Sequence, residues 1–193
     1  MSRPEKLSHP SGGGHTMSLE TEVKVRVDAR DMLQVRKRCL QLGGRCIGKR
    51  THESNVLFDF SGETLQAAGC ALRLRQAGKK ARLTFKGRLR SKSPFKQRQE
   101  IEVGVDDAPA TSRVLEALGL KSCFEYSKFR QMYALRVKGK RVLMSIDETP
   151  VGVFVELEGP EDVLEQAAGL FGWSRDVFLS QTYIELYREA GRG

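Results

Sequence analysis

Charged side chains recur at every second position in several short segments of the chain. These alternating sets are Glu20, Glu22 and Lys24, then Arg73 and Arg75, Glu100 and Glu102, Lys128 and Arg130, and Glu156 and Glu158. Side chains two residues apart on a β-strand point to the same face of a sheet. Each segment therefore places two or three charges side by side, while the intervening residues, which are mostly apolar, face the other way.

The chemistry of such a face depends on its mixture of acids and bases. Its carboxylates are Glu20, Glu22, Glu100, Glu102, Asp147, Glu156 and Glu158. Its bases are Lys24, Arg26, Arg73, Arg75, Lys86, Arg98, Lys128 and Arg130. Carboxylate oxygens are hard ligands that suit Mg²⁺ or Mn²⁺, and guanidinium and ammonium groups bind phosphate oxygens. The two sets in one cavity predict a polyphosphate held between a divalent metal ion and fixed cations.

This charged face cannot be buried dry, because removing an unpaired ion from water costs several kcal/mol. One such strand, over residues 19–27, would also fit an exposed edge with weak cross-strand ion pairs. Its recurrence in several strands instead favours a sheet closed around a wet interior. Phosphoryl transfer there would need positioning and charge neutralisation, with in-line attack by water or a hydroxyl and no covalent nucleophile.

The elements that must position these charges are mainly strands. After the strand over 19–27, strand-like runs cover 45–51, 54–60, 70–77, 80–87, 98–105, 123–137, 140–148 and 152–158, with a basic loop at 88–94. Helices are expected over 109–118, 160–171 and 181–190. The last of these would present Tyr183, Leu186 and Tyr187 on one face, for packing or for closing one end of the sheet. This α+β pattern has about eight or nine strands, enough to close a barrel.

A further helix is expected directly after the first strand, where it can cover one face of the sheet. Asp28 would cap this helix, and the glycine pair at 43–44 would end it. Its apolar positions follow helical spacing at Met32, Val35, Cys39 and Leu42.

The composition favours an anionic partner. The 193 residues include 33 Lys and Arg against 24 Asp and Glu, a formal charge of +9. These bases are interleaved with carboxylates, whereas a nucleic-acid surface more often presents an uninterrupted basic face with aromatic rings. We therefore expect a small anion as the binding partner, and neither nucleic acid nor a membrane.

The length predicts one domain over 18–193, and the Ser-, Gly- and Pro-rich residues 1–17 predict a disordered tail.

The four cysteines, Cys39, Cys46, Cys70 and Cys123, are widely spaced and include no C-x-x-C pair. We interpret them as reduced core residues, which suits a cytoplasmic protein. No apolar run approaches the ~18 residues of a membrane span, and the N-terminus lacks the apolar core of a signal peptide. The expected location is the cytoplasm.

Residues 20–24 resemble the ExExK signature of the CYTH superfamily, the triphosphate tunnel metalloenzymes, which include class IV adenylyl cyclases, thiamine triphosphatases and inorganic triphosphatases. Six further segments resemble this family in the same order, over 71–75, 83–87, 98–102, 128–130, 146–147 and 155–158. The resemblance spans roughly residues 18–190. It implies an eight-stranded antiparallel β-barrel with helices packed outside, forming a tunnel that binds a triphosphate with a divalent metal ion.

The resemblance also implies roles for individual residues. Expected metal ligands are Glu20, Glu22, Glu156 and Glu158, with Mg²⁺ or Mn²⁺ as the cofactor. Expected phosphate ligands are Lys24, Arg73, Arg75, Lys86 and Arg130. Expected catalytic residues are Lys128, Glu100, Glu102 and Asp147. Alternative roles, to orient the bases or to bind a second metal ion, are open for Glu100, Glu102, Asp147 and Glu156.

Three functions remain open on the sequence. The first is a metal-dependent triphosphatase, in which water attacks the terminal phosphoryl group. The second is a class IV adenylyl cyclase, in which the 3′-hydroxyl of ATP attacks the α-phosphorus and pyrophosphate leaves. The third is a non-catalytic module that binds polyphosphate or RNA, which the acidic set argues against because carboxylates repel phosphate unless a metal ion intervenes. A homodimer is compatible with each of them.

Overall fold

The computed structural model describes residues 16–89 and 95–191 of the chain. Its strands are β1 (Thr16–Val27), β2 (Arg45–Cys46), β3 (Thr51–Phe60), β4 (Ala71–Ala77), β5 (Lys80–Leu89), β6 (Lys96–Val105), β7 (Leu120–Val137), β8 (Lys140–Thr149) and β9 (Gly152–Glu158). Its helices are α1 (Met32–Gln41), α2 (Thr64–Ala67), α3 (Ala108–Ala117), α4 (Glu161–Gly169), the 3₁₀ turn η1 (Arg175–Val177) and α5 (Tyr183–Glu189).

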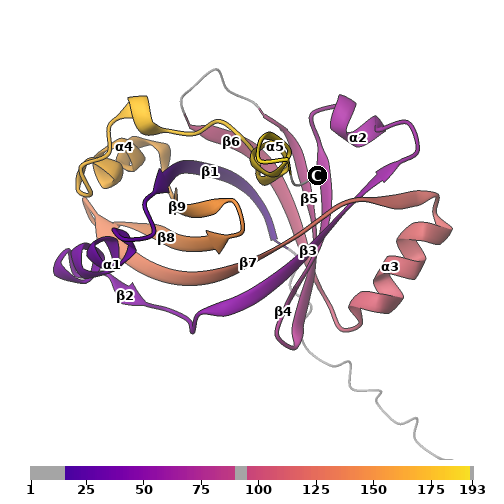
Figure 1. Cartoon of the computed structure of the whole chain (residues 1–193), viewed down its shortest axis with the longest axis horizontal. Helices are drawn as coiled ribbons and strands as arrows, with labels where there is room; N and C mark the ends of the chain where they lie inside the picture. Colours follow the sequence, from indigo (N-terminus) through magenta and orange to yellow (C-terminus); the bar gives the residue numbers. More distant parts are fainter. Residues whose placement is uncertain (1–15, 90–94, 192–193) are drawn as a thin grey trace, which may run out of the picture.

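The strands form one sheet that closes on itself. Its order is β2-β7-β3-β4-β5-β6-β1-β9-β8, and a further pairing of β7 with β8 joins the two ends. All of these pairings are antiparallel. The two-residue β2 only adds to the outside of β7, so the closed part is an eight-stranded antiparallel barrel (Figure 1). The expected barrel is confirmed.

Some element boundaries differ from the expected ones. The strand expected over 45–51 is wrong, because only Arg45 and Cys46 pair with β7. Gly48 follows them, and a glycine has no side chain to pack within a strand. Thr51 instead begins β3, which runs to Phe60.

The expected N-terminal tail over 1–17 is shorter by two residues, because Thr16 and Met17 belong to β1. Residues 1–15 lie outside the described residues, and so do residues 90–94 of the basic loop.

The start of α1 also differs from the sequence-based expectation. Asp31, and not Asp28, occupies the cap position of this helix. The Asp28 carboxylate instead accepts hydrogen bonds from the backbone N–H and the guanidinium group of Arg30, at 2.8 and 3.1 Å. Asp28 therefore shapes the turn between β1 and α1. The helix ends at Gln41 with Leu42 as its cap, just before the expected glycine pair, and the φ of +78° at Gly43 lies in the left-handed region that glycine adopts readily.

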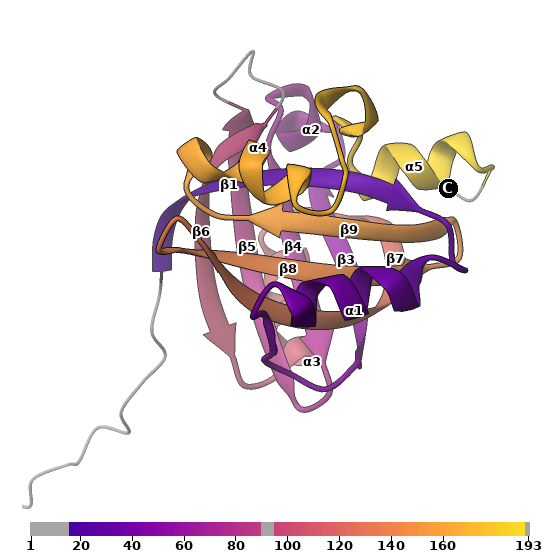
Figure 2. The same cartoon turned by 90° about the vertical axis from the view of Figure 1, so that its left-hand side faces the viewer.

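Apolar side chains face outward from the barrel and are covered by helices. Val23 and Val25 of β1 pack in one core cluster with Val35 of α1 and with Val163 and Leu164 of α4. Figures 1 and 2 show α1 and α4 on this side of the barrel, away from α2 and α3. The barrel is thus inverted relative to an ordinary globular core, since its apolar face points outward and its charged face inward.

Helix α5 packs across one end of the barrel. Its buried Tyr183, Leu186 and Tyr187 form a second core cluster with Leu57, Phe124, Tyr126 and Phe154. Figure 2 shows α5 projecting at one end of the strands, apart from the helices along their sides. The predicted packing face of this helix is confirmed, and residues 182–184 line the cavity at that end of the barrel.

The cysteines match their expected environment only in part. All four are free, but Cys39 is the one that is buried, whereas Cys46 and Cys123 are exposed. The interpretation of all four as core residues is therefore wrong. Burial raises the pKa of the Cys39 thiol to about 11.

In the part of the chain that the structure describes, no helix has the length and apolar character needed to cross a membrane.

Candidate functional site

The barrel encloses a cavity of ≈ 510 Å³ that side chains from all eight of its strands and from α5 line. Twelve of the thirteen residues that the sequence predicts for the site face this cavity. They are Glu20, Glu22, Lys24, Arg73, Arg75, Lys86, Glu100, Glu102, Lys128, Arg130, Glu156 and Glu158. The thirteenth, Asp147, is fully buried behind the cavity wall.

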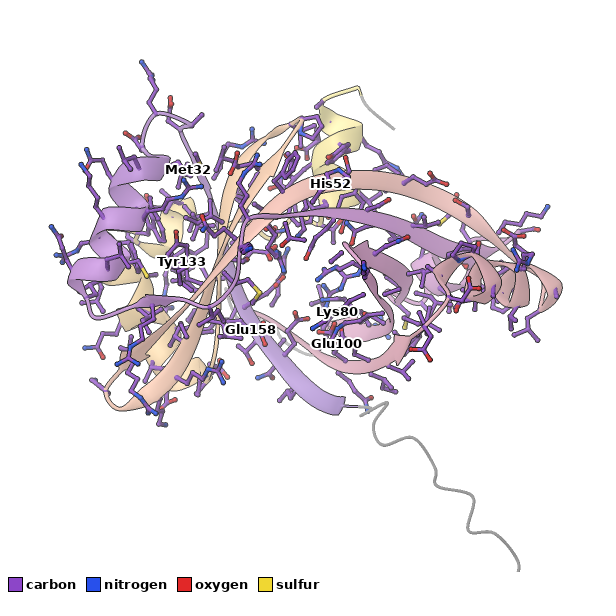
Figure 3. All side chains as sticks on the ribbon, turned by 90° about the horizontal axis from the view of Figure 1, so that it is seen from below. Met32, His52, Lys80, Glu100, Tyr133 and Glu158 are labelled. Atoms are coloured by element: carbon purple, nitrogen blue, oxygen red, sulfur yellow. The ribbon has the colours of Figure 1, made fainter. Side chains whose placement is uncertain are left out.

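The strand register explains how residues far apart in the sequence meet here. Glu22 lies opposite Glu158, and Lys24 lies opposite Glu156, in the β1–β9 pair. Because side chains alternate along each strand, aligning one such pair aligns every second residue of both strands on the inner face. In Figure 3 the labelled side chains of Lys80, Glu100 and Glu158 surround one opening.

Asp147 holds the bases at the end of the cavity near α5. Its carboxylate accepts hydrogen bonds of 2.6 Å from the Lys128 ammonium, the Arg130 guanidinium and the Tyr183 hydroxyl. Burial would raise the pKa of Asp147, but the positive charges of Arg130 and Lys128 outweigh it and lower the pKa. Asp147 therefore stays ionised and acts on the cavity through Lys128 and Arg130, without facing it.

Glu156 also contacts bases through both of its oxygens. It accepts a hydrogen bond from Arg130, and Lys24 Nζ lies 3.4 Å from its Oε1. Burial would raise the pKa of Glu156, yet the charges of Arg130 and Lys24 hold it well below its usual value. In this arrangement Glu156 fixes two bases that line the cavity, Arg130 and Lys24, which corresponds to the orienting alternative for this residue.

Lys24 is further held by α5 and the residues before it. Its Nζ donates a hydrogen bond of 3.3 Å to the Gln181 carbonyl and lies 3.9 Å from the centre of the Tyr183 ring. Lys96 Nζ donates to the same carbonyl at 2.6 Å. Burial and repulsion from Lys24 lower the pKa of Lys96 to about 8.

A second group of carboxylates gathers around Lys86. Lys86 Nζ donates to Glu20 at 2.8 Å and lies 3.4 Å from Glu100, while Arg98 lies 3.6 Å from Glu20. Burial would raise the pKa of Glu20, but Lys86 outweighs it and lowers the pKa to about 2. Burial and the charge of Glu20 raise the pKa of Glu100. One ammonium group is thus shared between two carboxylates.

Glu158 lies close to the other carboxylates of this group. Partial burial and repulsion from Glu20, Glu100 and Glu22 raise its pKa to about 7. Among the described residues, no group of three or more Asp, Glu, His or Cys side chains is placed so that it could hold a metal ion. Mg²⁺ often uses only one or two protein carboxylates, with water and substrate phosphates completing its shell. The carboxylate oxygens of this group are of the type that suits such a hard divalent cation.

The open end of the cavity carries a different set of contacts. Glu102 binds the guanidinium of Arg82 and accepts a hydrogen bond of 3.1 Å from the Thr84 hydroxyl. Exposed Lys80 lies at the same end, on the hairpin between β4 and β5. Glu102, expected as a catalytic residue, here orients Arg82.

Sequence reasoning missed several residues of the cavity and, besides Asp147, included Arg26, which does not line it. Glu53, Lys96, Arg82 and Tyr126 line it. Glu53 lies on β3, where no second charge stands two residues away, and Lys96 precedes the expected start of β6. The position of Glu53 opposite Lys128 in the β3–β7 register would have been the signal. Arg26 is exposed and donates to the Val151 carbonyl at 3.0 Å, beyond the end of the cavity.

Comparison with known proteins agrees with this architecture. The CYTH domain model matches residues 18–171. A Methanocaldococcus jannaschii protein provisionally named as an adenylate cyclase is 28% identical over 179 residues, which cover 87% of this chain and 98% of that protein. A Vibrio parahaemolyticus structure, also provisionally named as an adenylate cyclase, has a TM-score of 0.69 at 19% identity and covers 88% and 98% of the two chains.

A plant structure adds a second activity to the comparison. It is a Hippeastrum protein provisionally named as an adenylyl cyclase and described as having a dominant triphosphatase activity. Its TM-score is 0.64 at 18% identity, with 89% of this chain and 96% of that chain covered. At these identities the solved structures establish a shared fold.

Proposed function

Because the chain belongs to the CYTH domain family, we propose that it is a divalent-metal-dependent triphosphatase, in which water attacks the terminal phosphoryl group of a triphosphate held inside the barrel. The observation that supports this proposal is that one cavity is lined both by bases, which can bind phosphate oxygens, and by carboxylates, which can bind a divalent cation. A triphosphate needs the first set, and the metal ion that neutralises it needs the second.

The proposed roles follow the geometry of the cavity. Phosphate oxygens bind to Lys24, Arg73, Arg75, Lys86 and Arg130, all of which line it. Glu20, Glu22 and Glu158 would hold Mg²⁺ or Mn²⁺. The bound ion would neutralise phosphate charge and act as a Lewis acid. Lys128, which is 2% exposed, binds a phosphate oxygen or orients the attacking water.

Catalysis then depends on preorganised charge. Arg130 is fixed by Asp147 on one side and by Glu156 on the other, so its remaining N–H groups keep one orientation as charge develops on the phosphate. Donors that need no reorganisation in the transition state are a large source of rate enhancement. Phosphoryl transfer needs little else from the protein, and no covalent nucleophile is required.

A class IV adenylyl cyclase is the second candidate, favoured by the provisional name of the M. jannaschii relative. The two functions differ in whether the cavity holds an adenine ring. Among the described residues that line the cavity, the aromatic ones are Tyr126 and Tyr183, which stack at 5.5 Å in the end that α5 closes. The described part of the open end thus offers no aromatic ring for stacking, which supports the triphosphatase.

The test is an assay of the purified protein with Mg²⁺ or Mn²⁺ on tripolyphosphate, thiamine triphosphate and ATP. Orthophosphate, pyrophosphate and cyclic AMP are followed together. We expect orthophosphate without cyclic AMP. Cyclic AMP with an equal amount of pyrophosphate from ATP would establish the cyclase instead, and turnover that persists in EDTA would contradict the metal requirement.

A further inference from the structure

Glu53 of β3 differs from the other carboxylates, Asp147 and Glu156, that contact the bases near α5. Its side chain is 8% exposed and lines the cavity. Its Oε2 lies 3.4 Å from Arg75 Nε, 3.8 Å from Lys128 Nζ and 4.0 Å from Arg130 Nε. That oxygen has no hydrogen-bond partner among the described residues. One carboxylate thus lies among three cations without being hydrogen-bonded to any of them through this oxygen.

The neighbouring acids are engaged in another way. Asp147 accepts hydrogen bonds from Lys128, Arg130 and Tyr183, and Glu156 accepts one from Arg130. Those bonds fix the direction of each base. The contacts of Glu53 are longer than a hydrogen bond and are Coulombic, so they lower the potential at the three cations without accepting their protons. The hydrogen bonds of these cations go elsewhere: Lys128 and Arg130 donate to Asp147, and Arg75 Nε donates to the Asn55 side-chain oxygen at 3.1 Å.

The cations around Glu53 also repel one another. Burial and the charges of Arg73 and Arg130 lower the pKa of Arg75, and Glu53 opposes that shift. Without Glu53, the cations would form a concentrated positive site with only the shared, hydrogen-bonded acids to balance it. Such a site would bind any polyphosphate more strongly, including the product.

We propose that Glu53 is a positioning residue that weakens phosphate binding by the neighbouring cations. It keeps Arg75, Lys128 and Arg130 spaced so that a triphosphate binds and its product is released. This role rests on the proposed function, because it assumes that these three cations contact phosphate. Removing the charge of Glu53 while keeping its shape strengthens binding of a polyphosphate anion and slows turnover. A carboxylate with a merely structural role would weaken both binding and turnover when removed.

The experiment measures pyrophosphate binding to the metal-free full-length protein by calorimetry, for wild type, Glu53→Gln and Glu53→Asp. Glu125→Gln is the matched control, because Glu125 is exposed and does not line the cavity. We expect Glu53→Gln to bind pyrophosphate about tenfold more tightly, a moderate change for one charge at this range. Glu53→Asp, which keeps the charge, should remain near wild type, and Glu125→Gln should equal it.

Steady-state kinetics on tripolyphosphate with Mg²⁺ completes the test. Both KM and kcat should fall in Glu53→Gln, a combination that slow product release produces. If wild type binds pyrophosphate and Glu53→Gln binds it no more tightly, this inference is overturned and the proposed function stands. If metal-free wild type binds no pyrophosphate, the bases do not bind phosphate by themselves and this inference is overturned, while turnover of tripolyphosphate with Mg²⁺ decides the proposed function separately. Should Glu53→Gln not fold, an affinity of Glu53→Asp below that of wild type overturns the inference.

Discussion

At the residue scale, Glu22 gives the most direct test of the metal assignment. Its buried side chain lies opposite Glu158, and Lys96 Nζ lies 4.0 Å from its Oε1. Glu22→Gln removes a ligand charge without changing the side-chain volume. We expect metal-dependent activity to fall by at least ~100-fold, since even the loss of outer-shell partners of a metal costs up to about that much, while the melting temperature stays close to wild type.

The control for this variant is Glu116→Gln, on the exposed face of α3. Its activity should match wild type in the same phosphate-release assay. Wild-type activity in Glu22→Gln would remove Glu22 from the metal site.

Glu158 predicts a pH dependence of stability in the absence of metal. Its pKa is about 7 in the folded protein, above the ordinary value of 4.5 that applies when the chain is unfolded. A raised pKa means that the folded state binds the proton more tightly, so this contribution is full below about pH 4.5 and is lost as pH rises through about 7. In EDTA, wild type should therefore lose stability over this range.

Glu158→Gln should remove part of that loss. Because Glu158 is exposed at the open end, screening limits the effect to about 1 kcal/mol, or roughly 2–4 °C in the melting temperature at pH 8 for a chain of this size. Thermal unfolding in EDTA at pH 5 and pH 8 measures it. Identical pH profiles for the variant and wild type would show that the acidic group does not raise the pKa of Glu158.

The alternating charges predicted the inner face of most strands but not all of it. Where two charges stand two residues apart, as in Arg73 and Arg75, the local sequence marks the face. Glu53 has apolar or uncharged residues at the corresponding positions, so only its partner across the β3–β7 register identifies it. Whether an inward carboxylate faces the cavity, as Glu22 does, or lies behind its wall, as Asp147 does, depends on packing that sequence alone does not give.

At the scale of elements, α5 contacts the bases that line the cavity. Tyr183 donates to Asp147, and its ring lies below Lys24 and 4.6 Å from Lys128. Tyr183→Phe keeps the ring and removes the donor. We expect a loss of about 1–2 kcal/mol in the free energy of unfolding, because Asp147 loses one of its buried partners, and lower kcat as Lys128 and Arg130 lose alignment.

The comparison variant is Tyr133→Phe, in the outer core cluster and not in the cavity lining. Denaturant unfolding and kinetics are measured on both variants. If Tyr183→Phe were no less stable and no less active than Tyr133→Phe, α5 would be a cover without influence on the bases.

Element types were more predictable than their boundaries. The apolar face of α5 at Tyr183, Leu186 and Tyr187 is visible in the sequence because helical spacing is a local property. The short length of β2 and the early start of β3 could not be predicted from the local sequence. Strand length depends on the partner strand, which is β7 in both cases. Asp28 was misread for a related reason, since Asp occupies turns as readily as helix caps.

At the scale of the whole molecule, the cavity lining is positive overall. Among the described residues that line it, ten are Lys or Arg and seven are Glu. An excess of this sign attracts a polyphosphate before contact, and salt screens that attraction. Raising KCl from about 50 to 200 mM, where the Debye length falls below ~10 Å, should raise the KM for tripolyphosphate several-fold and change kcat little. A KM independent of salt would contradict this.

The closed sheet has a consequence for which substrates can be processed. Because α5 packs across one end of the barrel and its residues line the cavity there, the other end is the natural mouth for a substrate. If the proposed function holds, a linear phosphate polymer inserts a terminus and is not threaded through and cut internally. A cyclic phosphate has no terminus to offer. Degradation of a longer chain would proceed from its ends, one encounter at a time, with the shortened polymer backing out after each cut.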